Sequence, residues 1–151
     1  MKNKQEALER LAALEGETKA LRKIIEMPDA PLKITDRVNS FLDATTELSE
    51  NDPEIKKYRK LHAILDHDDW ICAVQRLVIL CKALNEGTVL TTKHTRHYPY
   101  FLVSSGFVFY TTTYDDAGAR TSSAARLCLK NSELAIHLGK KFLPEMEAVI
   151  K

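Results

Sequence analysis

The sequence predicts an α+β protein in which a small antiparallel β-sheet of about three strands is covered by a C-terminal helix. Three observations support this prediction. The first residues show heptad-like apolar spacing, the middle of the chain shows capped amphipathic helical patterns, and aromatic and β-branched runs precede one last helical pattern. We therefore expect an N-terminal coiled-coil oligomerisation helix at 1–26, a linker at 27–34 and a single α+β domain at 35–151.

The composition suits a domain with an ordinary core. The chain has 151 residues, of which 44% are hydrophobic, and its 22 basic and 21 acidic side chains leave a net charge of +1. No overall electric field therefore favours binding to nucleic acid or to an anionic membrane. The longest apolar run, 70–84, is interrupted by charged residues and is too short to span a bilayer. The Lys/Glu-rich N-terminus has no apolar signal segment, and Cys72, Cys81 and Cys128 stand far apart in apolar surroundings, so we expect reduced thiols, no cofactor and a cytoplasmic location.

An apolar seam near the N-terminus predicts self-association. The seam residues alternate spacings of four and three, and they are Ala7, Leu11, Leu14, Thr18, Leu21 and Ile25. In a parallel pair of chains Arg10 would lie opposite Glu15, and Glu17 opposite Arg22, so both flanking pairs are oppositely charged. We expect a parallel homo-oligomer, either a dimer or a trimer. The alternative is that this helix folds back onto its own domain.

Three helices are predicted in the middle of the chain. Thr35 can cap the first, which would reach Leu48, and two prolines in the linker separate it from the N-terminal helix. Asp52 can cap the second, with Pro53 in its first turn. The third, at 70–84, is apolar on more than one side and is therefore predicted to be central.

The C-terminal part reads as a hairpin, a strand and a helix. The runs 97–103 and 107–113 are aromatic and β-branched, and a short Gly-containing connection suits a hairpin with a bulge. A third strand is predicted at 125–130, followed by a helix capped by Asn131 or Ser132. The helix would cover the sheet with Leu134, Leu138, Phe142 and Met146.

Several segments resemble an uncharacterised family of small proteins that is common in phages and prophages of Bacteroidetes-type bacteria. The resemblance lies in KALNEG at 82–87, YPYF at 98–101, SGFVF at 105–109, RLCLKNSELA at 126–135 and GKKF at 139–142, with LRKIIE at 21–26 and ITDRV at 34–38 upstream. The chain departs from the family pattern at Thr88-Val89-Leu90, where the family has aromatic residues, and 65–81 looks like an insertion. The resemblance implies a phage or mobile-element origin and brings no established activity.

Basic and aromatic side chains mark two candidate surfaces for a nucleic acid or another partner. The first is the densest basic cluster of the chain, Lys56, Lys57, Arg59 and Lys60. The second interleaves cations with aromatic rings, as binders of single-stranded nucleic acid do, in Lys93, His94, Arg96, His97, Tyr98 and Tyr100. Each set has a simpler interpretation, a solvated helix face for the first and an exposed row beside core aromatics for the second.

The chain also contains one weak metal-ligand pattern. His62 and Asp66 would share a helix face, and His67 follows them. The acidic run from Asp66 to Asp69 is equally explained by capping of the next helix. No nucleophile elbow or Gly-rich phosphate loop occurs in the sequence.

These observations favour a non-enzymatic, self-assembling protein. We expect it to bind a host or defence macromolecule, a protein or ribonucleoprotein, as an inhibitor of bacterial immunity such as an anti-CRISPR protein would. The first alternative is an RNA or single-stranded DNA binding protein, and the second is a metal-dependent hydrolase. No membrane partner is expected.

Overall fold

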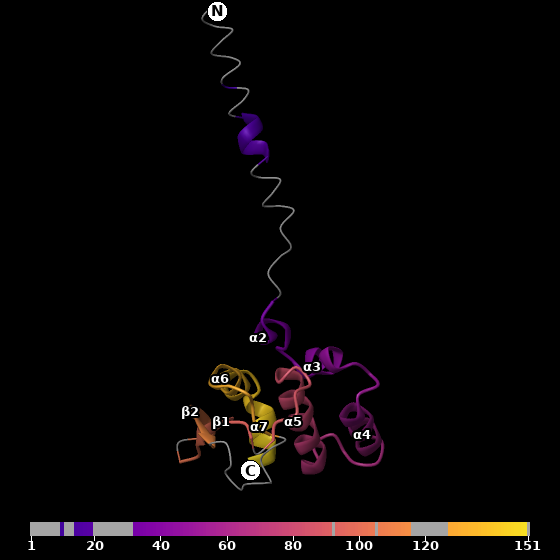
Figure 1. Ribbon diagram of the computed structural model, residues 1–151. Coiled ribbons are helices and arrows are strands. Elements are labelled where there is room, and N and C mark those ends of the chain that lie inside the picture. The colour runs from indigo at the N-terminus through magenta and orange to yellow at the C-terminus, as the bar shows by residue number, and fades with distance from the viewer. Residues whose placement is uncertain are drawn as a thin grey trace, which may run out of the picture. The chain divides into compact units, whose positions relative to one another are not determined.

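The computed structural model describes residues 10, 14–19, 32–91, 93–104, 106–115 and 127–150. The chain divides into two compact units, Met1–Leu32 and Lys33–Lys151. The elements of the second unit are α2 (Ile34–Arg37), α3 (Phe41–Leu48), α4 (Pro53–His62), α5 (Trp70–Leu84), β1 (Arg96–Leu102), β2 (Val108–Asp115), α6 (Ser132–Lys141) and α7 (Leu143–Ile150) (Figure 1). The predicted α+β class is confirmed. Among the described helices, none combines the length and the apolar character that crossing a membrane requires.

Helix α5 is the centre of the second unit, as its apolar composition predicts. It is buried over most of its length, and α3, α4, α6 and α7 all pack against it (Figure 1). The carboxylate of Asp69 caps it by accepting a hydrogen bond from the Ile71 N–H at 2.8 Å. It ends where Glu86 and Gly87 adopt positive φ angles of 54° and 75°, which reverses the chain direction.

The predicted single helix from Thr35 to Leu48 is wrong, because the chain forms two helices there. Helix α2 ends at Arg37, and the fully buried Val38 is extended with φ −107° and ψ 93°. The hydroxyl of Ser40 then accepts a hydrogen bond from the Asp43 N–H at 3.1 Å, while the Asp43 carboxylate accepts one from the Asn39 N–H at 3.0 Å. This pair is a variant of the capping box, in which the second hydrogen bond comes from the residue before the cap, and it starts α3 in place of the predicted cap at Thr35.

The hairpin forms as predicted and rests on α6. Strands β1 and β2 pair antiparallel from Arg96 opposite Asp115 to Leu102 opposite Val108, with one register shift between Tyr100 and Phe101. Helix α6 packs against both strands. It approaches them closely at Gly139, where an added Cβ would lie 2.9 Å from the Pro99 Cβ.

The predicted third strand is reduced to one bridge in the residues that the structure describes there, 127–130. Leu129 exchanges two backbone hydrogen bonds with His97 of β1, at 2.9 and 2.7 Å. On its other side the segment meets the buried amide of Asn85, which donates to the Cys128 carbonyl at 2.9 Å and accepts from the Lys130 N–H at 2.9 Å. A side chain therefore takes the place of a neighbouring strand, and the described sheet has two strands.

The predicted C-terminal helix is divided at Phe142. Asn131 caps α6 by accepting a hydrogen bond from the Leu134 N–H at 2.9 Å, which confirms one of the two predicted caps. Phe142 then leaves helical geometry, with φ −113° and ψ 37°, and α7 begins at Leu143. Pro144 lies in the first turn of α7, where its missing N–H costs no helical hydrogen bond.

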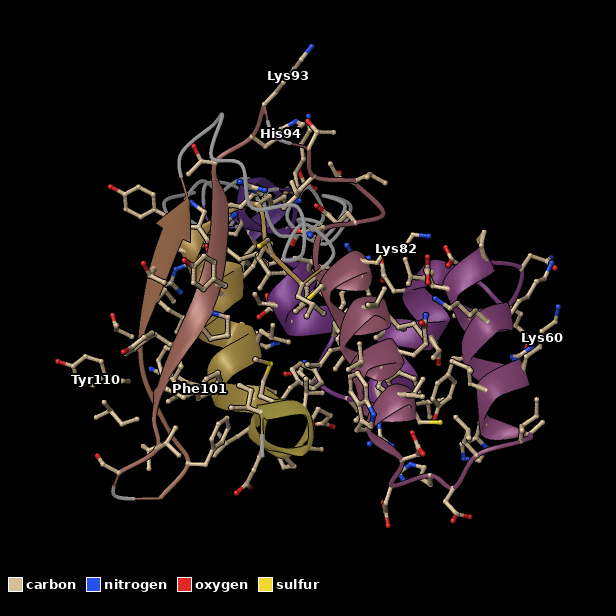
Figure 2. All side chains as sticks on the ribbon, turned by 90° about the horizontal axis from the view of Figure 1, so that it is seen from below. Lys60, Lys82, Lys93, His94, Phe101 and Tyr110 are labelled. Carbon is tan, nitrogen blue, oxygen red and sulfur yellow. The ribbon has the colours of Figure 1, made fainter. Side chains whose placement is uncertain are left out.

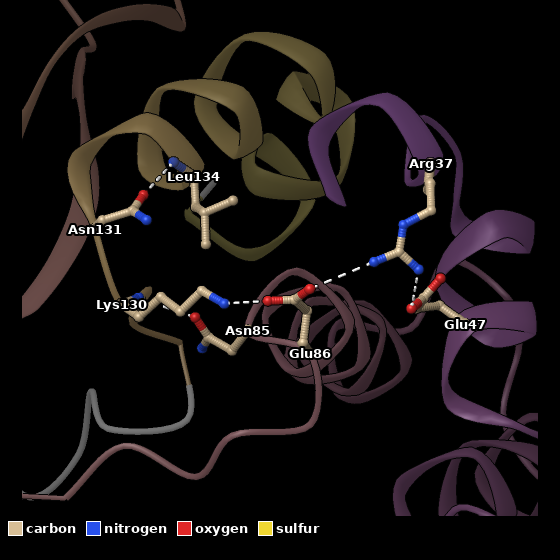
Figure 3. Close-up of polar contacts among 7 residues, drawn as sticks. All are labelled: Arg37, Glu47, Asn85, Glu86, Lys130, Asn131 and Leu134. Carbon is tan, nitrogen blue, oxygen red and sulfur yellow. Dashed lines mark hydrogen bonds and ion pairs between the residues drawn. The ribbon is translucent and has the colours of Figure 1, made fainter. Parts of the chain in front are cut away.

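A chain of charged groups joins the exit of α5 to its neighbours. Glu86 contacts both Lys130 and Arg37, and Arg37 also contacts Glu47 of α3 (Figure 3). Lys130, by its hydrogen bond and its charge, holds the pKa of Glu86 below the ordinary value of 4.5, and Arg37 acts in the same direction. These contacts join the end of α5 to the segment at Lys130 and to α2.

Candidate functional site

The basic cluster on α4 lies at the surface of the molecule. Lys56, Lys57, Arg59 and Lys60 are all exposed. Arg59 lies 3.5 Å from the carboxylate of Glu50, whereas the three lysines form no ion pair with any described residue. Lys56 and Lys60 stand one turn apart on the same side of the helix, where like charges repel. The three lysines therefore concentrate positive charge that the described part of the chain does not neutralise.

The predicted aromatic and basic set around the hairpin is not one surface. Arg96 is fully buried, and Pro99, three residues further along β1, is also buried. The Nδ1 atom of His94 accepts hydrogen bonds from the Thr91 N–H at 3.1 Å and from its hydroxyl at 2.9 Å, which holds the turn before β1. His97 and Tyr98 are partly buried, and the His97 ring lies 5.8 Å from the Tyr114 ring. Of the predicted set, only Lys93, His94 and Tyr100 are exposed.

The two basic candidates also lie far apart around the molecule. Helix α4 is on one side of α5, and the hairpin is beyond α6 on the other side (Figures 1 and 2). Lys60 points into solvent at one end of the view, while Lys93 and His94 stand beyond the start of β1 (Figure 2). The structure therefore does not combine the α4 cluster and the hairpin residues into one binding site.

The hairpin has an exposed apolar face that the sequence analysis did not single out. We call it the outer hairpin face and define it by the exposed side chains of Tyr100, Leu102, Val108 and Tyr110, whose exposed fractions are 52%, 40%, 51% and 63%. The ring centroids of Tyr100 and Tyr110 are 6.4 Å apart, and the rings meet edge to face. Tyr110 points away from the helices (Figure 2). The strand alternation could have revealed this face, because Phe101 and Phe109 occupy the positions that face α6.

The weak metal candidate does not have the geometry of a metal site. A guanidinium nitrogen of Arg76 lies 2.7 Å from Nε2 of His67 and 3.1 Å from its Nδ1. The positive charge of Arg76 at this ring disfavours a metal ion there. His67 and His62 are edge to face with ring centroids 5.6 Å apart. Within the described residues, no group of three or more His, Cys, Asp or Glu side chains could hold a metal ion. The carboxylate of Asp69 acts as a helix cap, as the alternative interpretation predicts.

The cysteines lie in the core. All three are free and buried. Burial raises the pKa of the Cys81 thiol, and the neighbouring Cys128 raises it further. Because the thiolate is the reactive form, such a thiol is a poor nucleophile.

An open cleft of about 450 Å³ separates α2 from α6. Its lining mixes acidic and basic groups, with Thr35, Asp36, Asn39, Glu133, Ile136, His137, Lys140 and Lys141. The Nε2 atom of His137 donates a hydrogen bond to the Val38 carbonyl at 2.7 Å, so this ring nitrogen holds α6 to the segment after α2. Because two acidic and two basic side chains line the cleft, its charge favours neither an anionic nor a cationic ligand.

The N-terminal unit contributes part of the predicted seam. Residues 14–19 are helical, and Leu14 is 59% exposed. Arg10, Glu15, Glu17 and Thr18 are helical as well, and the Thr18 hydroxyl donates to the Leu14 carbonyl at 2.7 Å. The other predicted seam and flanking positions, Ala7, Leu11, Leu21, Arg22 and Ile25, lie outside the described residues.

We compared the chain with protein-family models, with curated proteins and with solved structures. Nothing in any of the three sets matches it.

Proposed function

We propose that this chain is a non-enzymatic, self-assembling binding protein that presents its outer hairpin face to a macromolecular partner. The observation that supports this proposal most is the exposure of Tyr100, Leu102, Val108 and Tyr110 on one small hairpin. Exposed apolar patches on a well-packed domain are typical of protein interaction sites, and tyrosine is enriched at their energetic centres. Valine and leucine beside two tyrosines make this face better suited to a protein surface than to a charged ligand.

Self-assembly is assigned to the N-terminal seam. The exposed Leu14 and the helical geometry of 14–19 agree with a seam that needs a partner helix, since a short amphipathic helix is marginally stable alone. We expect Leu14→Lys to reduce the mass measured by light scattering in dilute solution from that of a dimer or trimer to that of a monomer. Lys19→Glu, on the outside of the same helix, is the matched control and should leave the mass unchanged. An unchanged mass for Leu14→Lys would contradict the coiled coil.

The partner belongs, in this proposal, to the host of a phage. This choice of partner is motivated by the resemblance to phage and prophage proteins. Under this proposal the protein would act in the cytoplasm of the host cell. The partner would be a host or defence protein or ribonucleoprotein, and the protein would act by occupying it, as an anti-CRISPR protein or another inhibitor of bacterial immunity does. Several copies joined at their N-termini would hold such a target more firmly than one.

A comparison of captured host proteins tests the outer hairpin face. The full chain and the variant Tyr100→Ser/Tyr110→Ser are each immobilised and exposed to host extract. Leu42→Ser serves as the control, because Leu42 is 73% exposed but lies on α3. We expect the tyrosine variant to lose a component that the full chain and the control both retain. If all three proteins capture the same components, the outer hairpin face is not the binding surface.

A second candidate function, binding of RNA or single-stranded DNA, is favoured by the α4 lysines. Lys56, Lys57 and Lys60 are exposed and unneutralised by described residues, which suits contact with phosphates. This function would use α4 without the hairpin aromatics.

Salt-titrated binding to oligonucleotides tests this candidate. Each phosphate contact should add roughly 0.7 to the slope of log affinity against log salt for a single strand. Lys56→Gln/Lys57→Gln/Lys60→Gln should then lower that slope by about 2, while Tyr100→Ser/Tyr110→Ser should not change it. Absence of affinity at low salt would remove the nucleic-acid function.

A further inference from the structure

One edge of the described sheet carries no neighbouring strand. The sheet consists of β1 and β2, and the other edge of β1 meets Leu129 through the bridge at His97. Strand β2 is therefore an edge strand in the described part of the chain, and its outward N–H and C=O groups are available for pairing.

Between Thr111 and Tyr114 this edge lacks the features by which edge strands usually avoid pairing. From Val108 to Tyr114 the strand contains no charged residue and no proline. The hairpin has its proline in β1, at Pro99, which already has β2 beside it. The single register shift leaves Tyr110 out of the pairing with β1, and the ladder is regular from Thr111 to Asp115. From Thr111 to Tyr114 this edge is thus regular, uncharged and without a neighbouring strand in the described part of the chain.

The sequence of this edge is symmetric. Tyr110-Thr111-Thr112-Thr113-Tyr114 reads the same in both directions. If two identical strands pair antiparallel about a two-fold axis at Thr112, Thr112 lies opposite Thr112 of the second copy and Thr111 lies opposite Thr113. Cross-strand threonine pairs are favourable, and no like charges oppose each other at these positions.

We propose that β2 pairs antiparallel with β2 of a second copy of this chain, about a two-fold axis at Thr112, so that the two hairpins form one continuous sheet. The side chain of Thr112 points toward α6, where its hydroxyl lies 3.0 Å from that of Ser132. Thr111 and Thr113 lie on the opposite face because strand side chains alternate. The pairing therefore leaves the packing of α6 undisturbed and places both outer hairpin faces on the same side.

A second copy fits this edge better than a foreign segment does. Any extended peptide could use the outward peptide groups, but an identical strand also matches the symmetric threonine positions. From Val108 to Tyr114 the edge has no charge that would select a charged peptide or a nucleic acid. This contact is distinct from the N-terminal seam and does not rest on it.

A charge-swap experiment on the full chain tests the register. All variants carry Leu14→Lys, so that association through the N-terminal seam is removed. In the proposed register, position 111 of one copy faces position 113 of the other, and this pair occurs twice. Thr111→Lys/Thr113→Lys therefore makes two pairs of like charge, whereas Thr111→Glu/Thr113→Lys makes two pairs of unlike charge. Sedimentation over a range of concentrations measures the dimer dissociation constant of each protein. We expect Leu14→Lys to be monomeric when dilute and to dimerise as its concentration rises. The lysine pair should weaken this dimer about tenfold or more, and the Glu/Lys pair should retain it.

Two results would overturn the proposal. One is a Leu14→Lys protein that remains monomeric over the whole range, and the other is equal association of the two charge variants. Hydrogen exchange of the unsubstituted chain provides a measurement that does not depend on variant folding. Amides between Thr111 and Tyr114 should become more protected as concentration rises, and protection that is independent of concentration would contradict the pairing. If Leu14→Lys retains the mass of the unsubstituted chain, the proposed association through the N-terminal seam is contradicted. The comparison of the two charge variants still tests the β2–β2 pairing in that case.

Discussion

Asp52 has two roles at the start of α4, and both use its carboxylate. It caps the helix by accepting a hydrogen bond from the Glu54 N–H at 2.9 Å, and its two oxygens accept from Nζ of Lys82 at 3.0 and 2.7 Å. Burial alone would raise the pKa of this carboxyl, but the hydrogen bond from Lys82 and that from the Glu54 N–H outweigh burial, so the pKa lies below the ordinary value of 3.8. One side chain thus joins α4 to the central helix.

We therefore expect Asp52→Ala to lower the free energy of unfolding by about 2–3 kcal/mol, since a cap and a charged hydrogen bond are both lost. Asp52→Asn keeps the cap and should lose about half as much. Because the pKa is depressed in the folded state, the contribution of Asp52 is present above pH 3.8 and is lost as the pH falls through the folded pKa. Urea titrations at several pH values should show the difference between Asp52 and Asn shrinking below pH 3.8. Asp66→Asn is the control, because Asp66 is exposed.

Gly139 is required where α6 crosses the hairpin. A Cβ at this position would lie 2.6 Å from a ring carbon of Phe109 and 2.9 Å from Pro99 Cβ, and the proline cannot move aside. Alanine favours a helix over glycine by about 1 kcal/mol, but we expect the overlap to outweigh this gain. Gly139→Ala should lower the free energy of unfolding by about 1–2 kcal/mol in urea titrations. Gly16→Ala meets nothing within 4 Å and should not destabilise the chain, so equal effects at both sites would contradict this account.

At the level of elements, the sequence predicts best what neighbouring residues determine. Helices α4 and α5 begin at the expected caps, Asp52 and Asp69, because a cap acts within one turn. The hairpin is predicted for the same reason, since its strands and their short connection are adjacent. The division near Val38 also had a local signal, the cap formed by Ser40 with Asp43, but the apolar spacing from Val38 to Leu48 outweighed it in the prediction. Pro144 is a local signal for the division of the C-terminal helix. The prediction followed the apolar spacing across Phe142 instead, and therefore gave one helix.

The predicted third strand is not confirmed in the residues described there, 127–130, and the physical reason lies elsewhere in the chain. Leu129 has its strand partner at His97, but the place of the next strand is taken by the amide of Asn85, a residue that reads as a helix end in the sequence. A strand prediction from 125–130 alone contains no information about that amide. The same limit applies to the candidate sites, because the wide separation of the α4 lysines from the hairpin follows only from the packing of helices between them.

Asn85 should accordingly be the most sensitive polar residue of this junction. Asn85→Ala leaves the Cys128 carbonyl and the Lys130 N–H without the partners they have now, in a buried place. We expect the free energy of unfolding to fall by about 2–4 kcal/mol, and hydrogen exchange at Leu129 to accelerate more than in the core of α5. Asn51→Ala, at an exposed position, is the control. Unchanged exchange at Leu129 would show that the bridge to β1 holds the segment without the amide.

For the whole molecule, the proposed assembly and the proposed binding face are separate parts of the chain. Leu14 belongs to the unit Met1–Leu32, and the outer hairpin face belongs to Lys33–Lys151. A substitution in the first unit can therefore change how many faces act together without changing any one face. This separation makes avidity measurable once a partner has been captured.

Avidity should depend on the spacing of the immobilised partner. On a dense surface the unsubstituted chain can engage two partner molecules, and we expect it to dissociate roughly 10–100 times more slowly than Leu14→Lys applied at a concentration at which that variant is monomeric. On a sparse surface, where neighbouring partners are out of reach, the two proteins should dissociate at equal rates, because each contact is then single. Tyr100→Ser/Tyr110→Ser should bind weakly at both densities, since it changes the face itself. Dissociation of the unsubstituted chain that does not slow with partner density would contradict multivalent binding, even if the outer hairpin face is the surface that the partner contacts.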